Sequence, residues 1–227
     1  MPKSIVRHVA YGEHGLTLVD RLGAWLSRRR VLRHLPRKTD LTALDCGCGF
    51  YAILLRDLKP RLSRGLGIDI HIDPAVRAME RLEFIESTLE ESLPALPPDD
   101  FDLVLLISVL EHLTDPEETL NQCYRLLRPG GALLVNVPTW AGKRGLEFSA
   151  FKLRLSPAEE MNDHKMYYGK RDLWPLLVKS GFKPRHIKLN YCKFGLNLFG
   201  VCRKLGETQP APDVPPERAK EVGKAKP

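Results

Sequence analysis

The sequence predicts an α/β domain with a mostly parallel sheet and helices on both of its faces. Between residues 41 and 138, short apolar stretches alternate with helical stretches, which is typical of βαβ units. Two of these helices begin with an N-cap aspartate followed by proline, at Asp73-Pro74 and Asp115-Pro116. Two more strand-like stretches, 184–191 and 196–204, come near the end of the chain.

The N-terminal region, residues 1–40, is expected to be a helical cover on this domain. Residues 14–35 have the spacing of a helix and end in a basic run, Arg28–Arg30. The apolar residues at helical spacing are Leu16, Val19, Leu22, Trp25 and Leu26, and the helix is expected to pack on the domain with one face solvated.

The α/β domain itself is expected to span residues 41–205. Residues 139–170 have no strand pattern and are rich in Lys, Arg, Tyr and His, so they are interpreted as an insertion within the domain. A helix is expected over 171–180, ended by Gly181. Residues 206–227 contain almost no large apolar side chains, and this composition predicts a disordered tail.

Composition places the protein in the cytoplasm. No apolar run approaches the roughly 20 residues that a membrane-spanning helix needs. The first residues lack the apolar block and cleavage site of a signal peptide. Five cysteines, an odd number, are better interpreted as reduced thiols than as a disulfide framework.

Charge is unevenly distributed along the chain. Residues 1–40 hold nine Lys and Arg against three Asp and Glu, and residues 136–203 hold thirteen against five. Residues 41–135 between them hold eight against sixteen. If the basic flanks converge, they form a positive rim that attracts an acidic molecule; ordinary solubilising charge is the alternative. The rim would draw on Arg28–Arg30, Lys143, Arg144, Lys165, Lys170 and Arg171.

A glycine-rich turn follows the first predicted strand, in the run LTALDCGCGFYA at residues 41–52. Gly47 and Gly49 let the chain turn sharply and let a ligand lie against bare backbone. The spacing Gly47-x-Gly49-x-x-Ala52 also satisfies the dinucleotide fingerprint, which is a weak signal alone. Asp45 favours a different ligand, because a carboxylate before the turn would repel a pyrophosphate and suits a cationic ligand.

A second acidic residue ends the next strand. In GLGIDI, residues 65–70, Asp69 lies 24 residues after Asp45, where a carboxylate can accept both hydroxyls of an adenosine ribose. The alternative role, an acidic cap on the following helix, fits Asp73 better than Asp69.

Four motifs in order resemble class I methyltransferases of the type 11 family, which includes quinone-pathway enzymes. They are LDCGCG (44–49), IDI (68–70), FDLVLLISVLEHL (101–113) and LLRPGGALLVNVP (126–138). The resemblance implies a Rossmann-like sheet of seven strands, mostly parallel and closed by an antiparallel C-terminal hairpin. It also implies S-adenosyl-L-methionine at the carboxyl ends of the strands.

The resemblance carries over to particular residues. Asp45 and the backbone of Gly47, Cys48 and Gly49 would meet the methionine part of the cofactor, and Asp69 the ribose. The segment 84–94 resembles the family's adenine loop, so Thr88 and Leu89 would flank the base; Ile107 would line the pocket. Tyr51 replaces a frequent third glycine, and Thr88 a frequent aspartate.

Methyl transfer is an in-line displacement in which positioning does most of the catalysis. A base is needed when the acceptor atom holds a proton. His112 and His164 have the appropriate pKa range, in that order of preference; a structural role at a helix start is the alternative for His112, and a solvated loop for the cluster around His164. No metal is expected at Cys46-x-Cys48, because no Cys or His pair follows at zinc spacing.

The sequence therefore predicts a methyltransferase acting on a small, acidic molecule. An NAD-dependent oxidoreductase and a non-catalytic adenosylmethionine-binding module are the alternatives. No RNA-binding module is recognisable, and membrane contact through the N-terminal helix is not favoured. Residues 163–177 and 193–204 are similar to methyltransferases of bacterial surface-polysaccharide loci, which suggests a phosphorylated or lipid-linked sugar as acceptor.

Overall fold

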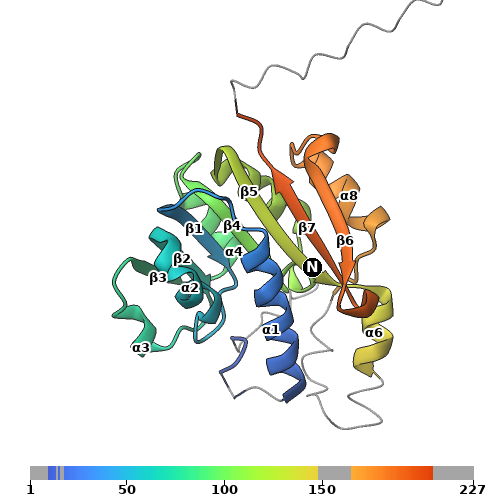
Figure 1. The fold of residues 1–227 in the computed structure, drawn as a ribbon, viewed down its shortest axis with the longest axis horizontal. Helices are drawn as coiled ribbons and strands as arrows, with labels where there is room; N and C mark the ends of the chain where they lie inside the picture. Colours follow the sequence, from blue (N-terminus) through green and yellow to red (C-terminus); the bar gives the residue numbers. More distant parts are fainter. Residues whose placement is uncertain (1–9, 14, 16–17, 148–164, 207–227) are drawn as a thin grey trace, which may run out of the picture.

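The computed structural model describes residues 10–13, 15, 18–147 and 165–206, and a seven-stranded sheet runs through them (Figure 1). The strand order is β3-β2-β1-β4-β5-β7-β6, and only β7 runs antiparallel to its neighbours. This confirms the predicted fold class. The strands are β1 (Leu41–Cys46), β2 (Leu62–Asp69), β3 (Leu82–Glu86), β4 (Phe101–Ile107), β5 (Leu127–Pro138), β6 (Ile187–Cys192) and β7 (Asn197–Arg203).

Helices cover both faces of the sheet, because alternate side chains along each buried strand point to opposite sides. One core contains Val31, Leu55 and Val76 from the helices on one face, and the other contains Leu120 and Leu173. The helices of the first face are α1 (Leu18–Arg33), α2 (Ile53–Leu58) and α3 (Pro74–Arg77). Those of the second are α4 (Leu89–Ser92), α5 (Pro116–Leu126) and α8 (Lys170–Lys179), and α6 (Trp140–Glu147) follows β5.

The two predicted Asp-Pro helix starts are confirmed. The Asp73 carboxylate accepts a hydrogen bond from the Ala75 N–H at 2.9 Å, and α3 begins at Pro74. Asp115 accepts in the same way from the Glu118 N–H at 2.9 Å at the start of α5. Each cap satisfies a backbone donor that the first helical turn leaves without a partner.

The predicted N-terminal helix is present as α1, and two of the apolar residues that indicated it are exposed. Leu22 and Trp25 are 57% and 44% exposed, whereas Val31 is fully buried. The helix packs through Arg30 and Val31, with the Arg30 guanidinium 5.4 Å from the Phe199 ring centroid. Hydrophobic periodicity misses this face because an arginine stem that covers apolar surface counts as polar in the pattern.

β5 begins at Leu127 and therefore includes the Pro-Gly-Gly run of the fourth motif, residues 129–131. Gly130 donates to the Lys204 carbonyl at 3.0 Å, and Lys204 donates to the Gly131 carbonyl at 2.9 Å. The two C-terminal strands are present as β6 and β7, with later starts than predicted.

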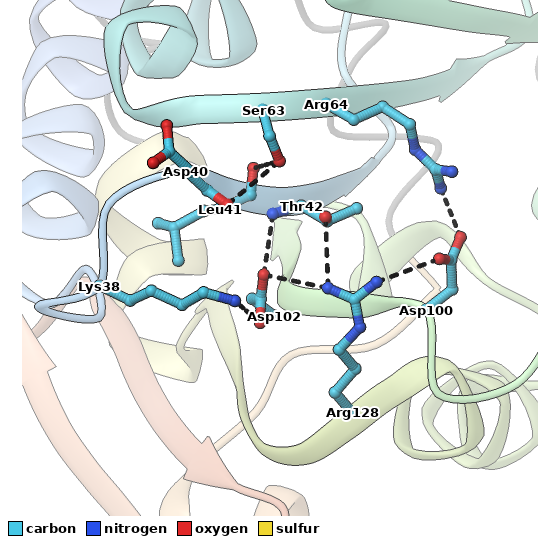
Figure 2. A network of polar contacts seen from close by, with 9 residues as sticks. All are labelled: Lys38, Asp40, Leu41, Thr42, Ser63, Arg64, Asp100, Asp102 and Arg128. Atoms are coloured by element: carbon cyan, nitrogen blue, oxygen red, sulfur yellow. Dashed lines mark hydrogen bonds and ion pairs between the residues drawn. The ribbon is translucent and has the colours of Figure 1, made fainter.

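A polar network joins the strands at the edge of the sheet where β1 and β4 begin (Figure 2). Asp102 accepts from Lys38 at 2.8 Å, from the Thr42 N–H at 3.0 Å and from Arg128 at 3.3 Å. Asp100 pairs with Arg64 and Arg128. This network fastens the amino ends of the strands, opposite the edge where the glycine-rich turn lies.

Within the described ranges, no helix has the length and apolar character to cross a lipid bilayer. Residues 148–164 of the predicted insertion, and residues 207–227 of the tail predicted to be disordered, lie outside the described residues.

Candidate functional site

The glycine-rich turn after β1 has the backbone conformation that its glycines permit. Gly47 and Gly49 both have φ of +74°, in the left-handed region. A Cβ added at Gly47 would lie 2.4 Å from the Val109 Cγ2 atom. Because the segment after β4 approaches the turn this closely, position 47 has no room for a side chain.

Asp69 holds the glycine-rich turn against the end of β2. Its carboxylate accepts hydrogen bonds from the Gly49 N–H at 2.7 Å and from the Ile70 N–H at 2.8 Å. The Gly47 and Cys48 N–H groups donate to the Ile68 carbonyl at 2.8 and 3.1 Å. The predicted ribose ligand therefore lies directly beside the turn and also organises it.

Asp45 is the second-last residue of β1, just before the glycine-rich turn. The residue is buried, with 2% of its surface exposed. Burial, and secondarily the negative charge of Asp69, raises its pKa to about 7. None of the hydrogen bonds among the described residues reaches its carboxyl oxygens. Two neighbouring carboxyl groups beside bare glycine backbone suit a ligand that carries positive charge.

The end of β4 is bent sharply beside this turn. Ser108 has φ of +58°, which is uncommon outside glycine and costs about 1–2 kcal/mol. Its N–H donates to the Asn136 carbonyl at 2.8 Å, and its hydroxyl accepts from the Asn136 side-chain amide at 3.3 Å. Ile107 ends β4 half-buried and packs in the core on the α1 side of the sheet. Nothing in the sequence pattern indicated the strained Ser108.

His112 lies in the short 3₁₀ helix η3 (Leu110–His112) that follows this bend. Its N–H donates to the Val109 carbonyl at 2.9 Å, and its side chain is half-buried. His112 therefore lies three positions along the chain from Val109, whose side chain lies against Gly47. His164, the second candidate base, lies outside the described residues.

The residues expected near an adenine base follow β3. The Ser87 N–H donates to the Asp69 carbonyl at 3.0 Å, which places this segment next to the ribose candidate. Thr88 caps α4, and its hydroxyl accepts from the Glu91 N–H at 3.3 Å. Leu89 and Cys48 are buried, 7% and 8% exposed, and their side chains pack in the two cores. Burial raises the pKa of the Cys48 thiol well above its usual value.

An N-terminal turn covers the glycine-rich segment. The Tyr11 carbonyl accepts from the Phe50 N–H at 3.0 Å, and Glu13 pairs with His71 at 3.1 Å. Sequence reasoning missed this contact, because no local pattern marks a turn that packs against a distant loop.

The two tyrosines of the predicted insertion are buried rather than part of a solvated loop. Tyr167 and Tyr168 are 5% and 1% exposed, and the Tyr168 hydroxyl donates to the Leu110 carbonyl at 3.3 Å. Burial, with smaller contributions from Glu111 and Asp172, raises the pKa of Tyr168 to about 12. Tyr168 therefore anchors the last part of the predicted insertion beside the segment that follows β4.

The cations of the predicted basic rim make separate contacts. Arg28 pairs with Asp57 of α2, and Lys165 donates to the Thr114 hydroxyl at 2.6 Å. Lys143 lies over the rings of Trp140 and Tyr167. Lys170 lies over Tyr191, and Arg171 is exposed; the Arg144 side chain lies outside the described residues. Arg29 and Arg30, by contrast, line a cavity of about 150 Å³ beside α1.

The geometry fits S-adenosylmethionine. The glycines of the turn carry no side chains of their own, Asp45 and Asp69 supply carboxyl groups, and both strands end at the same edge of the sheet. In sheets of this kind, ligands bind at the carboxyl ends of the strands where the strand order reverses, and β1 lies at that point here.

Comparison with known proteins agrees with this geometry. Residues 44–135 match the family model described as a methyltransferase domain. A Mycolicibacterium smegmatis protein named "Probable S-adenosylmethionine-dependent methyltransferase" is 33% identical over 147 residues, which cover 61% of this chain and 56% of that protein. A ubiquinone biosynthesis O-methyltransferase of Klebsiella pneumoniae is 26% identical over 154 residues, covering 63% of this chain and 62% of the relative. The chain thus spans less than two thirds of either relative.

Among solved structures, a SAM-dependent methyltransferase from Archaeoglobus fulgidus superposes with a TM-score of 0.60 at 18% identity, over 79% of this chain and 94% of that one. This likeness establishes the fold. The family match, the relatives and the fold together support S-adenosyl-L-methionine as the cofactor and a methyltransferase as the kind of enzyme.

Proposed function

We propose that the chain is an S-adenosylmethionine-dependent methyltransferase that acts on a small acidic molecule. The observation that carries the proposal is the pair of carboxyl groups, Asp45 and Asp69, beside the glycine-rich turn. A pyrophosphate would be repelled by this pair, whereas the positively charged amino acid part of S-adenosylmethionine would be attracted to it.

Each residue of the site then has a defined task. The ionised Asp45 carboxylate would attract the ligand's ammonium group. The Asp69 carboxylate accepts one backbone hydrogen bond at each oxygen, and the remaining lone pairs of these oxygens would accept hydrogen bonds from the ribose hydroxyls. Gly47 and Gly49 would allow close approach of the methionine part. Thr88 and the Leu89 backbone would lie against the base, and Ile107 would form the apolar wall.

When bound, S-adenosylmethionine supplies a methyl group already activated by a positively charged sulfur. The chain's own contribution is to orient the acceptor in line with that methyl group, which requires positioning more than proton transfer. For an acceptor that holds a proton, His112 is the proposed base, because it is half-buried and follows the bend after β4. His164 stays a second candidate from the sequence.

The acceptor is proposed to be a hydroxyl on an acidic small molecule. The Klebsiella pneumoniae relative is named as an O-methyltransferase of ubiquinone biosynthesis, which supports an oxygen nucleophile. The sequence similarity to surface-polysaccharide enzymes adds phosphorylated and lipid-linked sugars to the acceptors worth testing. The cytoplasmic location predicted from the sequence stays a prediction.

The test is transfer of a labelled methyl group from S-adenosylmethionine by the full chain. The acceptor panel pairs each phosphorylated or carboxylated sugar, and each hydroxylated aromatic acid, with its uncharged counterpart. We expect a labelled product with at least one acidic member and much less with its neutral partner. Binding of S-adenosylhomocysteine without transfer to any member would favour a non-catalytic binding module, and preference for neutral members would overturn the acidic acceptor.

A further inference from the structure

We propose that the cavity beside α1 binds the acidic group of the methyl acceptor. The cavity has a volume of about 150 Å³ and lies between α1, the end of β5 and the turn after β6. Four cations line it, Arg29, Arg30, Arg33 and Lys193, and no carboxylate is among the described residues of its wall. The assignment of the anion to an acceptor rests on the proposed function.

Among the described residues no carboxylate forms an ion pair with any of the four cations, although the charge of the Glu111 carboxylate acts on Lys193 and favours its protonated form. No hydrogen bond or ion pair within the described ranges involves the side chains of Arg29, Arg33 or Lys193. The Arg30 Nε atom is buried without a hydrogen-bond partner. The two arginine contacts that are present, Arg29 over Trp25 and Arg30 over Phe199, orient the guanidinium groups against aromatic rings and leave their charge uncompensated.

Two other arginines of the chain are paired with carboxylates, in contrast to those of the cavity. Arg28, on the same helix, pairs with Asp57, and Arg128 pairs with Asp100 and Asp102. Lys193 is also partly removed from water, and that burial lowers its pKa. Arg30 and Lys193 are partly buried, whereas Arg29 and Arg33 are exposed at the cavity wall. Because the three arginines converge without an ion-pair partner among the described residues, a bound anion would be stabilised there.

The cavity lies beside the proposed cofactor site. Its wall includes Asn136, which is 1% exposed and pairs in register with Ile107 of β4. Directly paired residues of neighbouring strands share a face, so Asn136 is on the same side of the sheet as Ile107. The Asn136 amide also donates to the hydroxyl of Ser108. An anion in the cavity would therefore hold the rest of its molecule near the carboxyl ends of β4 and β5.

Size and donor type indicate the chemical class of the ligand. A water molecule takes about 30 Å³ in the liquid, so the cavity has room for a group of a few heavy atoms. Guanidinium groups present paired donors that match the oxygens of phosphate and carboxylate groups. The ligand is a small oxyanion, and we take it to be a phosphate or carboxylate group of the methyl acceptor rather than a free ion.

The test measures binding of inorganic phosphate to the full chain by calorimetry, with sodium chloride holding the ionic strength constant. Arg33→Gln and Lys193→Met each remove one cavity cation, and Arg37→Gln removes an exposed cation outside the cavity as the matched control. We expect each cavity variant to bind phosphate at least fivefold more weakly, while Arg37→Gln stays within twofold of the original chain. Equal weakening in all three variants, or no binding to the original chain, would overturn the cavity as an anion site.

Two further measurements separate the sources and the hypotheses. Glycerol phosphate should bind about as tightly as inorganic phosphate, because a cavity that takes the phosphate group of an acceptor must have room for the rest of the ester. If inorganic phosphate binds and glycerol phosphate does not, the anion in the cavity is not part of an acceptor molecule. S-adenosylhomocysteine should bind every variant within twofold of the original chain, which also shows that each is folded. If it binds none of them, the original chain included, the proposed function fails, whatever the phosphate result.

Discussion

Asp69 accepts a hydrogen bond from the Gly49 N–H at 2.7 Å, and this bond ties the end of β2 to the turn after β1. Asp69 therefore shapes the site as well as being its proposed ribose ligand. A substitution there is expected to change the protein's stability together with its cofactor affinity.

Asp69→Asn tests this double role. The amide keeps the shape of the side chain but loses the charge and can accept only one of the two backbone donors. We expect S-adenosylhomocysteine binding to weaken by about 1–3 kcal/mol and the melting temperature to fall. Asp73→Asn is the control, because asparagine caps a helix as well as aspartate does. Unchanged affinity and stability in Asp69→Asn would remove Asp69 from the site.

Gly47→Ala tests the close approach of the turn to Val109. The added Cβ would meet the Val109 Cγ2 atom at 2.4 Å, in addition to the strain of a positive φ. Gly130→Ala measures that strain alone, because Gly130 has φ of +83° and no atom within 4 Å of the added Cβ. We expect Gly130→Ala to cost about 1–2 kcal/mol in the free energy of unfolding and Gly47→Ala to cost more.

Val109→Ala should relieve part of the clash. In chemical denaturation, the double variant Gly47→Ala/Val109→Ala is expected to be more stable than the sum of the single effects predicts, by about 0.5 kcal/mol or more. Strict additivity would mean that the two residues do not meet in the way described.

Asp45 should make the stability of the empty protein depend on pH. Its pKa rises from 3.8 to about 7 on folding, so the folded state holds a proton that the unfolded state has released. The resulting stabilisation is fully present below pH 3.8 and is lost as the pH rises to about 7. We expect Asp45→Asn to raise the melting temperature relative to the original chain increasingly across this range. A difference independent of pH would contradict the raised pKa.

Cofactor binding should show the opposite trend. The ammonium group of S-adenosylhomocysteine favours the ionised form of Asp45. Because the pKa of the Asp45 carboxyl is about 7 in the empty protein, the affinity is expected to rise between pH 6 and 8 as this carboxyl loses its proton. Calorimetry in buffers of different ionisation enthalpy should detect proton release on binding at pH 6.5. Asp45→Asn should bind more weakly and release no proton.

Much of the site could be predicted from local sequence. The caps at Asp73 and Asp115 depend on residues two or three positions away, and the roles of Gly47 and Gly49 follow from a strand entering a tight turn. The Tyr11 contact could not be predicted, because it joins residues distant in the sequence. The cavity is a similar case, since Arg33 and Lys193 come together only when α1 packs across β5 and β7.

The polar network at the amino ends of the strands should stabilise the fold without affecting the site. Burial alone would raise the pKa of Asp102, but hydrogen bonds from Lys38 and Thr42 and the charges of Lys38 and Arg128 outweigh it and lower that pKa below 3.8. Its contribution is therefore present above pH 3.8 and is lost as the pH falls through the lower folded value.

Asp102→Asn is expected to lose about 1–2 kcal/mol of unfolding free energy at pH 7, allowing for solvent screening. The loss should shrink as the pH falls below 3.8, while S-adenosylhomocysteine affinity stays unchanged. Glu83→Gln, at an exposed strand position, should have little effect on either quantity. A large loss of cofactor affinity in Asp102→Asn would contradict the separation of the two edges of the sheet.

The central claim is that the glycine-rich turn with Asp45 and Asp69 binds S-adenosylmethionine rather than a dinucleotide. Isothermal titration calorimetry of the full chain with S-adenosylhomocysteine and, separately, with NAD tests it most directly. We expect S-adenosylhomocysteine to bind one molecule per chain, with affinity reduced in Asp45→Asn and Asp69→Asn, and NAD to show no saturable binding. Tight NAD binding without binding of S-adenosylhomocysteine would contradict the account.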